Sequence, residues 1–197
     1  YNMVGGIIGG SINEIENCEN NGKINIAGTI WAYGGAGGIV GCASETNIIK
    51  NCCNTGNVLG NDTRRGGIVG VIYTSSRTSI LIDSCTNMGK ASSGICDLLC
   101  LGNLKIVNSR NLEECENSGI IREIQAGNYD IDIECNIKNS YNLGKTQNAG
   151  IVATIGYVSK SVKLNIENVY NSGECTSAII GTISQKGITT LNISNVY

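Results

Sequence analysis

The feature that most constrains this chain is a short phrase that returns along it about every thirty residues. The clearest copy spans residues 49–56 and has the pattern Ile-x-Asn-Cys-x-Asn-x-Gly. Further copies begin at Ile15, Ile82, Leu112, Ile137, Ile166 and Ile193, and closing glycines stand at positions 22, 56, 89, 119, 144 and 173. Such an array folds as a stack of similar units, because one unit alone cannot bury its apolar face.

A second phrase, Gly-Gly-Ile-Val-Gly, accompanies the first at residues 37–41 and 66–70, with variants near 5–9, 93–96, 149–153 and 177–181. The paired apolar residues predict a short buried strand, and the flanking glycines allow tight bends at both of its ends. Neither a helix signal nor Gly-Lys-Ser/Thr follows these glycines, so a phosphate-binding loop is excluded.

The residues between the recurring phrases are predicted to form β-strands. Apolar and polar residues alternate at 24–26, 81–83, 130–134 and 163–166, which is typical of half-buried strands. The sequence therefore predicts an all-β, parallel β-solenoid of about three strands per coil and about seven coils, forming one domain over residues 1–197. The crossover rule for parallel strands favours a right-handed coil. Because the chain opens and closes at nearly the same phase of the repeat, we expect a slice of a longer array whose adjoining repeats cover the coil ends.

Each recurring position of the first phrase has an expected role. The closing glycine is expected at a corner with a positive φ. Stacked asparagine amides should form a ladder from coil to coil, and the Cys, Ser or Val between them should face a narrow interior. The predicted structural ladder comprises Asn17, Cys18, Asn20, Asn51, Cys52, Asn54, Cys85, Asn87, Cys115, Asn117, Asn139, Asn142, Asn168 and Asn171.

The chain has ten cysteines and no histidine. Cysteines one coil apart are close enough for disulfides. The column position also accepts Val169 and Val196, however, which favours buried free thiols acting as small hydrophobes. The spacing of Cys96 and Cys100 lacks the partner ligands of a zinc site, so we expect neither metal nor cofactor.

Charge excludes other classes of function. The net charge is −2, whereas nucleic-acid binding requires a basic stripe, so no nucleic-acid partner is expected. Arg64 and Arg65 are expected in a solvated loop. The chain shows no stretch that would span a membrane.

The two phrases together resemble the GLUG-type repeats of bacterial surface proteins and adhesins, over nearly the whole chain. The resemblance implies an extracellular, cell-surface stalk or adhesive module, whose partners would be a host or environmental glycan or a cell-surface protein. The chain departs from the family pattern in using Ile where Leu is frequent and in its many cysteines.

Without histidine, Ser-His-Asp and Cys-His catalysis are excluded, and carboxylates remain. Asp130, Asp132 and Glu134 alternate with isoleucines, so they are expected on one strand face. Enzymes that cleave polysaccharides use paired acids, and such an enzyme is the alternative hypothesis. A solvated strand face explains the same pattern and is the favoured interpretation.

Four aromatic residues are candidates for ligand binding. Trp31 and Tyr33 are two residues apart and should share a strand face, while Tyr141 and Tyr170 directly follow the small-residue column. Exposed rings would stack on a sugar, whereas buried rings would fill a coil corner. The sequence thus favours a non-enzymatic extracellular module, either a rigid stalk or an adhesive surface.

Overall fold

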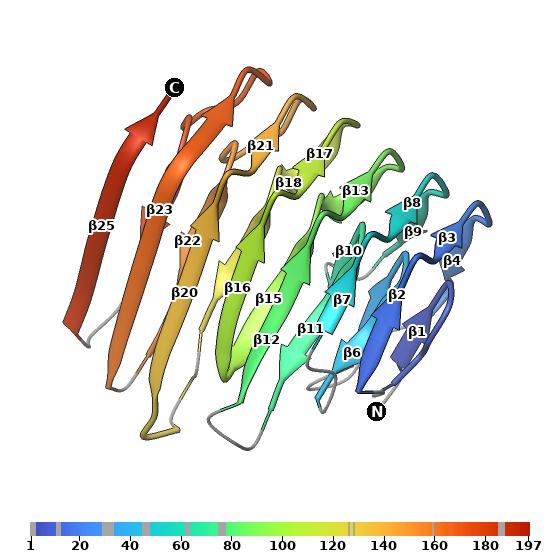
Figure 1. Ribbon diagram of the computed structural model, residues 1–197, viewed down its shortest axis with the longest axis horizontal. Helices are drawn as coiled ribbons and strands as arrows, with labels where there is room; N and C mark the ends of the chain where they lie inside the picture. Colours follow the sequence, from blue (N-terminus) through green and yellow to red (C-terminus); the bar gives the residue numbers. More distant parts are fainter. Residues whose placement is uncertain are drawn as a thin grey trace.

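The computed structural model of the chain describes residues 3–10, 13–28, 34–44, 48–61, 64–74, 78–125, 127, 129–158, 160–184 and 188–197. Parallel strands stack side by side along the longest axis of the molecule, and the described residues contain no helix (Figure 1). The predicted all-β parallel solenoid is thereby confirmed. It has about six turns instead of seven, and its handedness stays a prediction.

One sheet, the long sheet, carries the alternating strands. It contains β2 (Glu14–Glu16), β7 (Ile48–Lys50), β12 (Ser79–Asp83), β16 (Asn103–Val107), β20 (Asp132–Lys138), β23 (Ser161–Asn171) and β25 (Ile188–Val196). Every second residue points inward, as in β20, where Ile133, Cys135 and Ile137 are buried. The last strand, β25, is followed by no corner strand within the described residues.

Short corner strands continue the long sheet around one end of each coil. They are β3 (Glu19–Asn20), β8 (Cys53–Asn54), β13 (Thr86–Asn87), β17 (Arg110–Asn111), β21 (Tyr141–Asn142) and the last residues of β23. Between long and corner strands, one residue per coil takes a left-handed φ near 50°, namely Asn17, Asn51, Ser84, Asn108, Asn139, Asn168 and Asn195. Asparagine tolerates this conformation better than most residues. The prediction that the closing glycines have positive φ is therefore wrong, because the first asparagine makes the corner.

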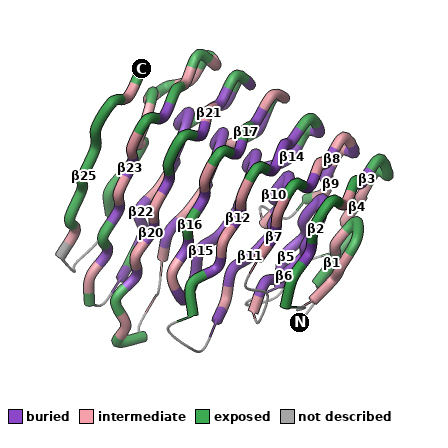
Figure 2. Tube along the Cα trace, in the orientation of Figure 1, coloured by how far each residue is buried: buried purple, intermediate pink, exposed green. Residues whose placement is uncertain are grey.

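The buried sheet closes the interior opposite the long sheet. It contains β6 (Val40–Ala43), β11 (Val69–Tyr73), β15 (Cys96–Leu101), β19 (Ile121–Ile124), β22 (Val152–Ile155) and β24 (Ile180–Ile183). In β15 all six residues are buried, and the run of buried positions continues through the middle of the stack (Figure 2).

A short sheet packs against the buried sheet. Its strands are β1 (Met3–Gly5), β5 (Gly35–Gly37), β10 (Arg65–Gly66), β14 (Ala91–Ser93) and β18 (Cys115–Ser118), and β4 (Ile24–Ile26) pairs separately with β9 (Val58–Gly60). The second phrase forms the bend between the two sheets. Ile39 is buried at this bend and Val40 begins β6, so the expected strand starts one residue later than predicted.

The asparagine ladder is confirmed and runs through the corner strands. The Nδ2 atoms of Asn20, Asn54, Asn87, Asn111 and Asn142 each donate to the Oδ1 atom of the next asparagine, ending at Asn171, over 2.7–2.9 Å. Each ladder residue also donates to the carbonyl two residues later, as Asn87 does to Gly89 at 2.7 Å. A side chain at Gly67 would place its Cβ 2.3 Å from Asn87 Cγ, so the glycine phrase leaves the space that the ladder fills.

The structure corrects the phase of the fourth repeat. In register, Asn111 aligns with Asn87 and Asn142, so this copy spans residues 106–113 and ends on Glu113 in place of glycine. Ser109 occupies the small-residue column, and its hydroxyl accepts a hydrogen bond from the Cys85 N–H at 3.2 Å. Cys115 aligns instead with Ala91 in the short sheet.

Asn117 likewise lies outside the ladder. Its Nδ2 donates to Ser92 Oγ at 3.0 Å, and its Oδ1 accepts from Asn148 at 3.0 Å. The corner asparagines form a separate, exposed series, in which Asn139 donates to Asn108, Asn168 to Asn139 and Asn195 to Asn168.

Candidate functional site

A concavity of the described residues lies where the buried sheet turns into the long sheet, and we call it the turn pocket. It encloses about 650 Å³. Its lining residues are Tyr73, Thr74, Leu101, Gly102, Asn103, Tyr129, Asp130, Ile131, Asp132, Ile133, Glu134, Lys160, Ser161 and Lys163. They come from successive coils, so the stack itself assembles the pocket.

The connections beside this pocket differ in length. Gly102 alone joins β15 to β16, whereas residues 74–78 and 125–131 join the equivalent strands of the neighbouring coils. Gly102 has φ of +98°, and a Cβ there would lie 2.0 Å from Thr74 Cγ2. Only glycine suits both the conformation and the space, so a larger residue at position 102 would disturb this turn.

Two tyrosines meet at the pocket. The hydroxyl oxygens of Tyr73 and Tyr129 are 3.5 Å apart. Tyr129 is 42% exposed, while Leu101 in the lining is buried. The pocket therefore offers aromatic and aliphatic carbon beside polar atoms, the mixture that is common in small-molecule sites.

All three acids singled out in the sequence line the turn pocket. Asp132 and Glu134 are two residues apart on β20 and flank the buried Ile133, as predicted. Asp130 precedes the strand, so only two of the three share its face. Asp132 Oδ2 lies 3.2 Å from Lys160 Nζ and Glu134 Oε1 lies 3.0 Å from Lys163 Nζ. Within these ion pairs the carboxylates are acceptors for hydrogen bonds.

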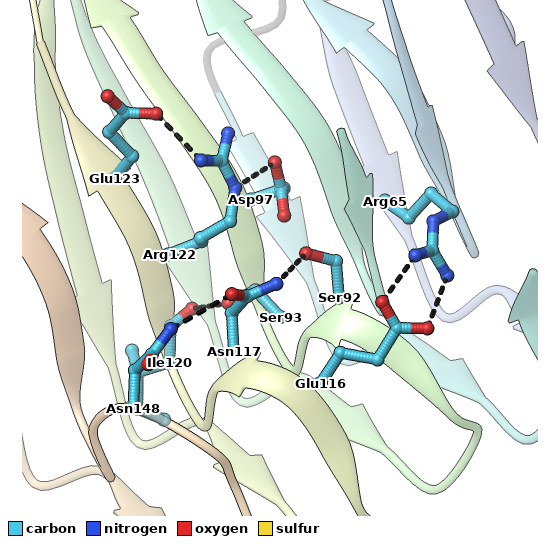
Figure 3. Close-up of polar contacts among 10 residues, drawn as sticks. All are labelled: Arg65, Ser92, Ser93, Asp97, Glu116, Asn117, Ile120, Arg122, Glu123 and Asn148. Carbon is cyan, nitrogen blue, oxygen red and sulfur yellow. Dashed lines mark hydrogen bonds and ion pairs between the residues drawn. The ribbon is translucent and has the colours of Figure 1, made fainter. Parts of the chain in front are cut away.

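A second polar cluster lies between the short and buried sheets (Figure 3). Asp97 on β15 is fully buried, and its Oδ2 accepts from Arg122 Nε at 2.9 Å. Arg122 also donates to Glu123 at 2.7 Å. Burial raises the pKa of Asp97 to about 6, although the Arg122 charge and the Ser92 hydroxyl oppose this shift. The cluster ties adjacent coils together and is enclosed, which suits a structural role.

The arginine pair differs from the sequence prediction. Arg65 lies on β10 and is buried, not in a solvated loop, and it forms a two-pronged ion pair with Glu116 on β18 (Figure 3). It also donates to the Val58 carbonyl at 3.3 Å. A buried guanidinium needs such partners, and they connect the short sheet to β9.

The tyrosines of the corner strands form a separate surface feature. Tyr141 and Tyr170 are register partners in adjacent coils, and Tyr170 is 45% exposed. Arg110 donates to the Tyr141 hydroxyl at 3.3 Å. Trp31 and Tyr33 lie outside the described residues.

All ten cysteines are free thiols. Cys52 and Cys85 are buried in the small-residue column, as expected, while Cys18 at its first coil is partly exposed. Burial raises the pKa of Cys42 and Cys100 to about 11 and that of Cys115 to about 12. In the described part of the chain, no three Cys, Asp or Glu side chains come together as metal ligands.

Several of the residues that line the turn pocket were not predicted from the sequence. Tyr129, Asn103, Lys160 and Lys163 do not recur with the repeat, so the alignment of copies gives them no significance. The available signal was the spacing between Ile124 and Cys135, which is longer than the spacing between their register partners Leu99 and Leu104.

Comparison with known proteins identifies one motif. No curated protein and no solved structure shows significant similarity to the chain. Among the described residues, no helix has the length and apolar character needed to cross a membrane. Residues 1–25 match the GLUG motif, and with the repeated strands described above this match is consistent with a GLUG repeat region.

Proposed function

We propose that the chain is a non-enzymatic, extracellular repeat module of a bacterial surface protein, serving as a rigid stalk or an adhesive surface. The observation that carries this proposal is the continuity of the stack. The same asparagine ladder, apolar core and strand register pass from coil to coil. The GLUG motif at residues 1–25 adds support.

Rigidity follows from how the coils are joined. Each coil pairs with its neighbours through parallel strands in two or more sheets, and the buried amide bonds of the ladder add a connection inside the corner. In such a linear array each unit contacts only its neighbours, so length grows without loss of local order. A structure of this kind holds its side faces at fixed positions.

The side faces supply candidate adhesive groups. Tyr141 and Tyr170 present phenol rings one coil apart on the corner strands, and the turn pocket offers further tyrosines with carboxylates. Tyrosine combines an apolar ring with a polar hydroxyl, which suits it to partly solvated contacts. A host or environmental glycan or a cell-surface protein is the proposed partner.

Retention on immobilised mucin and a panel of polysaccharides tests the adhesive role, with analysis of the liquid for released oligosaccharides. We expect retention without release. Sustained release would show an enzyme and overturn the proposal. Absence of retention would remove the adhesive role and leave the stalk, which single-molecule pulling would test by its unfolding force.

A further inference from the structure

The shape of the turn pocket suits a ligand of limited size. Its volume of about 650 Å³ falls within the usual range for small-molecule sites, about 300–1,000 Å³. The walls belong to several coils, so a ligand lying along the stack would contact all of them. The Gly102 turn forms part of the lining, and a side chain there would intrude on Thr74.

The wall chemistry suits a polyhydroxylated ring. Tyr73 and Tyr129 provide aromatic carbon, and Leu101 and Ile131 provide aliphatic carbon. The Asn103 Oδ1 atom accepts from the Glu134 N–H at 2.9 Å, so its Nδ2 atom can donate to a hydroxyl group, while the nearby carboxylates can accept from hydroxyl groups. A saccharide presents both apolar C–H faces and hydroxyl edges, so it matches a pocket that offers both kinds of wall.

The charge of the lining limits which saccharides fit. Asp132 and Glu134 are paired with lysines at 3.2 and 3.0 Å. Asp130, by contrast, forms no ion pair with any residue that the structure describes. Three carboxylates against two ammonium groups leave the lining net negative. A neutral or amino-bearing sugar is therefore favoured over a polyanionic one.

From these observations we propose that the turn pocket binds a short stretch of a neutral or amino-bearing oligosaccharide. This inference rests on the adhesive form of the proposed function and names its ligand class and site. The tyrosines hold the sugar face, Asp130 favours an ammonium group on the sugar, and Asn103 orients the hydroxyls.

Calorimetric titration tests the ligand class, with cellotriose, chitotriose, a glucosamine trimer and trigalacturonate as probes. We expect the glucosamine trimer to bind tightest, the two neutral trimers to follow, and trigalacturonate to bind at least tenfold more weakly. Tightest binding of trigalacturonate, or no binding of any probe at millimolar concentration, would overturn the proposal.

Matched variants test the site. Tyr129→Ala should weaken the neutral trimers about five- to tenfold, the range expected for loss of an aromatic contact. Tyr157→Ala, which removes a tyrosine that is 37% exposed and does not line the pocket, should leave binding unchanged. Asp130→Asn should reduce the preference for the glucosamine trimer about threefold, as for an exposed ion pair. Equal affinity in wild type and Tyr129→Ala would contradict the assignment.

The same variants separate this proposal from the proposed function. Retention on polymers that survives Tyr129→Ala would keep the adhesive function and reject the pocket as its site. Loss of both retention and oligosaccharide binding in the wild type would reject the adhesive function and the pocket together. Circular dichroism of each variant confirms that the fold is retained.

Discussion

Single asparagines carry much of the connection between coils. Asn87 is fully buried and forms two ladder bonds as well as a bond to the Gly89 carbonyl. An unpaired polar group in the interior costs more than the net value of the hydrogen bond that it lost. The ladder is therefore most sensitive at its central members, where both neighbours depend on the same amide.

Replacing Asn87 by Ala should lower the free energy of unfolding by about 2–3 kcal/mol, because it leaves the Asn54 Nδ2 and Asn111 Oδ1 atoms without their partner. Urea denaturation followed by circular dichroism measures this. The control is Asn192→Ala, since Asn192 donates to Asn165 on the exposed face of β25, where a change within about 0.5 kcal/mol is expected. Equal effects of the two substitutions would contradict a stabilising ladder.

Because Asp97 is buried, we expect the free energy of unfolding to depend on pH in an unusual way. Burial raises its pKa to about 6 in the folded chain, against about 3.9 when unfolded. Between these values the folded state binds more protons, so this residue's contribution to stability falls as pH rises from about 4 to 6 and then stays low. Comparing wild type with Asp97→Asn across pH 4–7 isolates it, and we expect the wild type to lose about 2–3 kcal/mol relative to the variant. A pH-independent difference would contradict the prediction.

At the scale of the element, glycine sets how closely consecutive turns approach. A Cβ at Gly89 would lie 2.0 Å from the Gly56 carbonyl oxygen, whereas a Cβ at Gly28 would meet nothing within 4 Å. Since the obstructing atom belongs to the backbone, a coil must shift before a side chain fits. The stacking distance, and not φ, thus requires the closing glycines at positions 56, 89, 144 and 173.

Gly89→Ala should therefore destabilise the chain by about 2–3 kcal/mol, in the range of overpacked interiors. Gly28→Ala serves as the matched control, and its effect should stay within about 1 kcal/mol. Urea denaturation of both variants gives the comparison. A Gly89→Ala variant as stable as wild type would show that the coils tolerate wider spacing.

Some of these elements could be predicted from the sequence and others could not. The strand type, parallel stacking and amide ladder follow from local alternation and from repeated asparagines. The fourth copy was misplaced because Glu113 replaces its closing glycine, and Ser118-Gly119 offered a false one. Residues 118–122 are in fact a copy of the glycine phrase. Asp97 and Arg122 occupy the last position of this phrase in adjacent coils, and their pairing becomes visible only when the copies are aligned in this way. The turn pocket lies beside connections of unequal length, and an alignment of the repeats at their shared positions disregards such differences.

At the scale of the whole molecule, stability should vary along the stack. Residues of the central coils, such as Leu99 and Ile106, are fully buried, whereas Ile183 and Ile193 are each 47% exposed. In an array with contacts between neighbours only, the least covered coils open first. Burial is accordingly densest in the middle of the stack (Figure 2).

Hydrogen exchange measured by mass spectrometry should reveal this gradient. We expect the amides of β12, β15 and β16 to exchange slowest and those of β24 and β25 fastest, because the latter have fewer covering neighbours. Uniform exchange along the chain would indicate a single cooperative unit instead of a linear array.

The free thiols add a chemical consequence. Alkylating reagents react with the thiolate, and burial keeps Cys42, Cys96 and Cys135 both enclosed and protonated. Each of these cysteines will therefore be labelled by a maleimide only when its own coil opens. Because the cysteines are distributed from coil to coil, the order in which they acquire the label would record the order in which the stack comes apart.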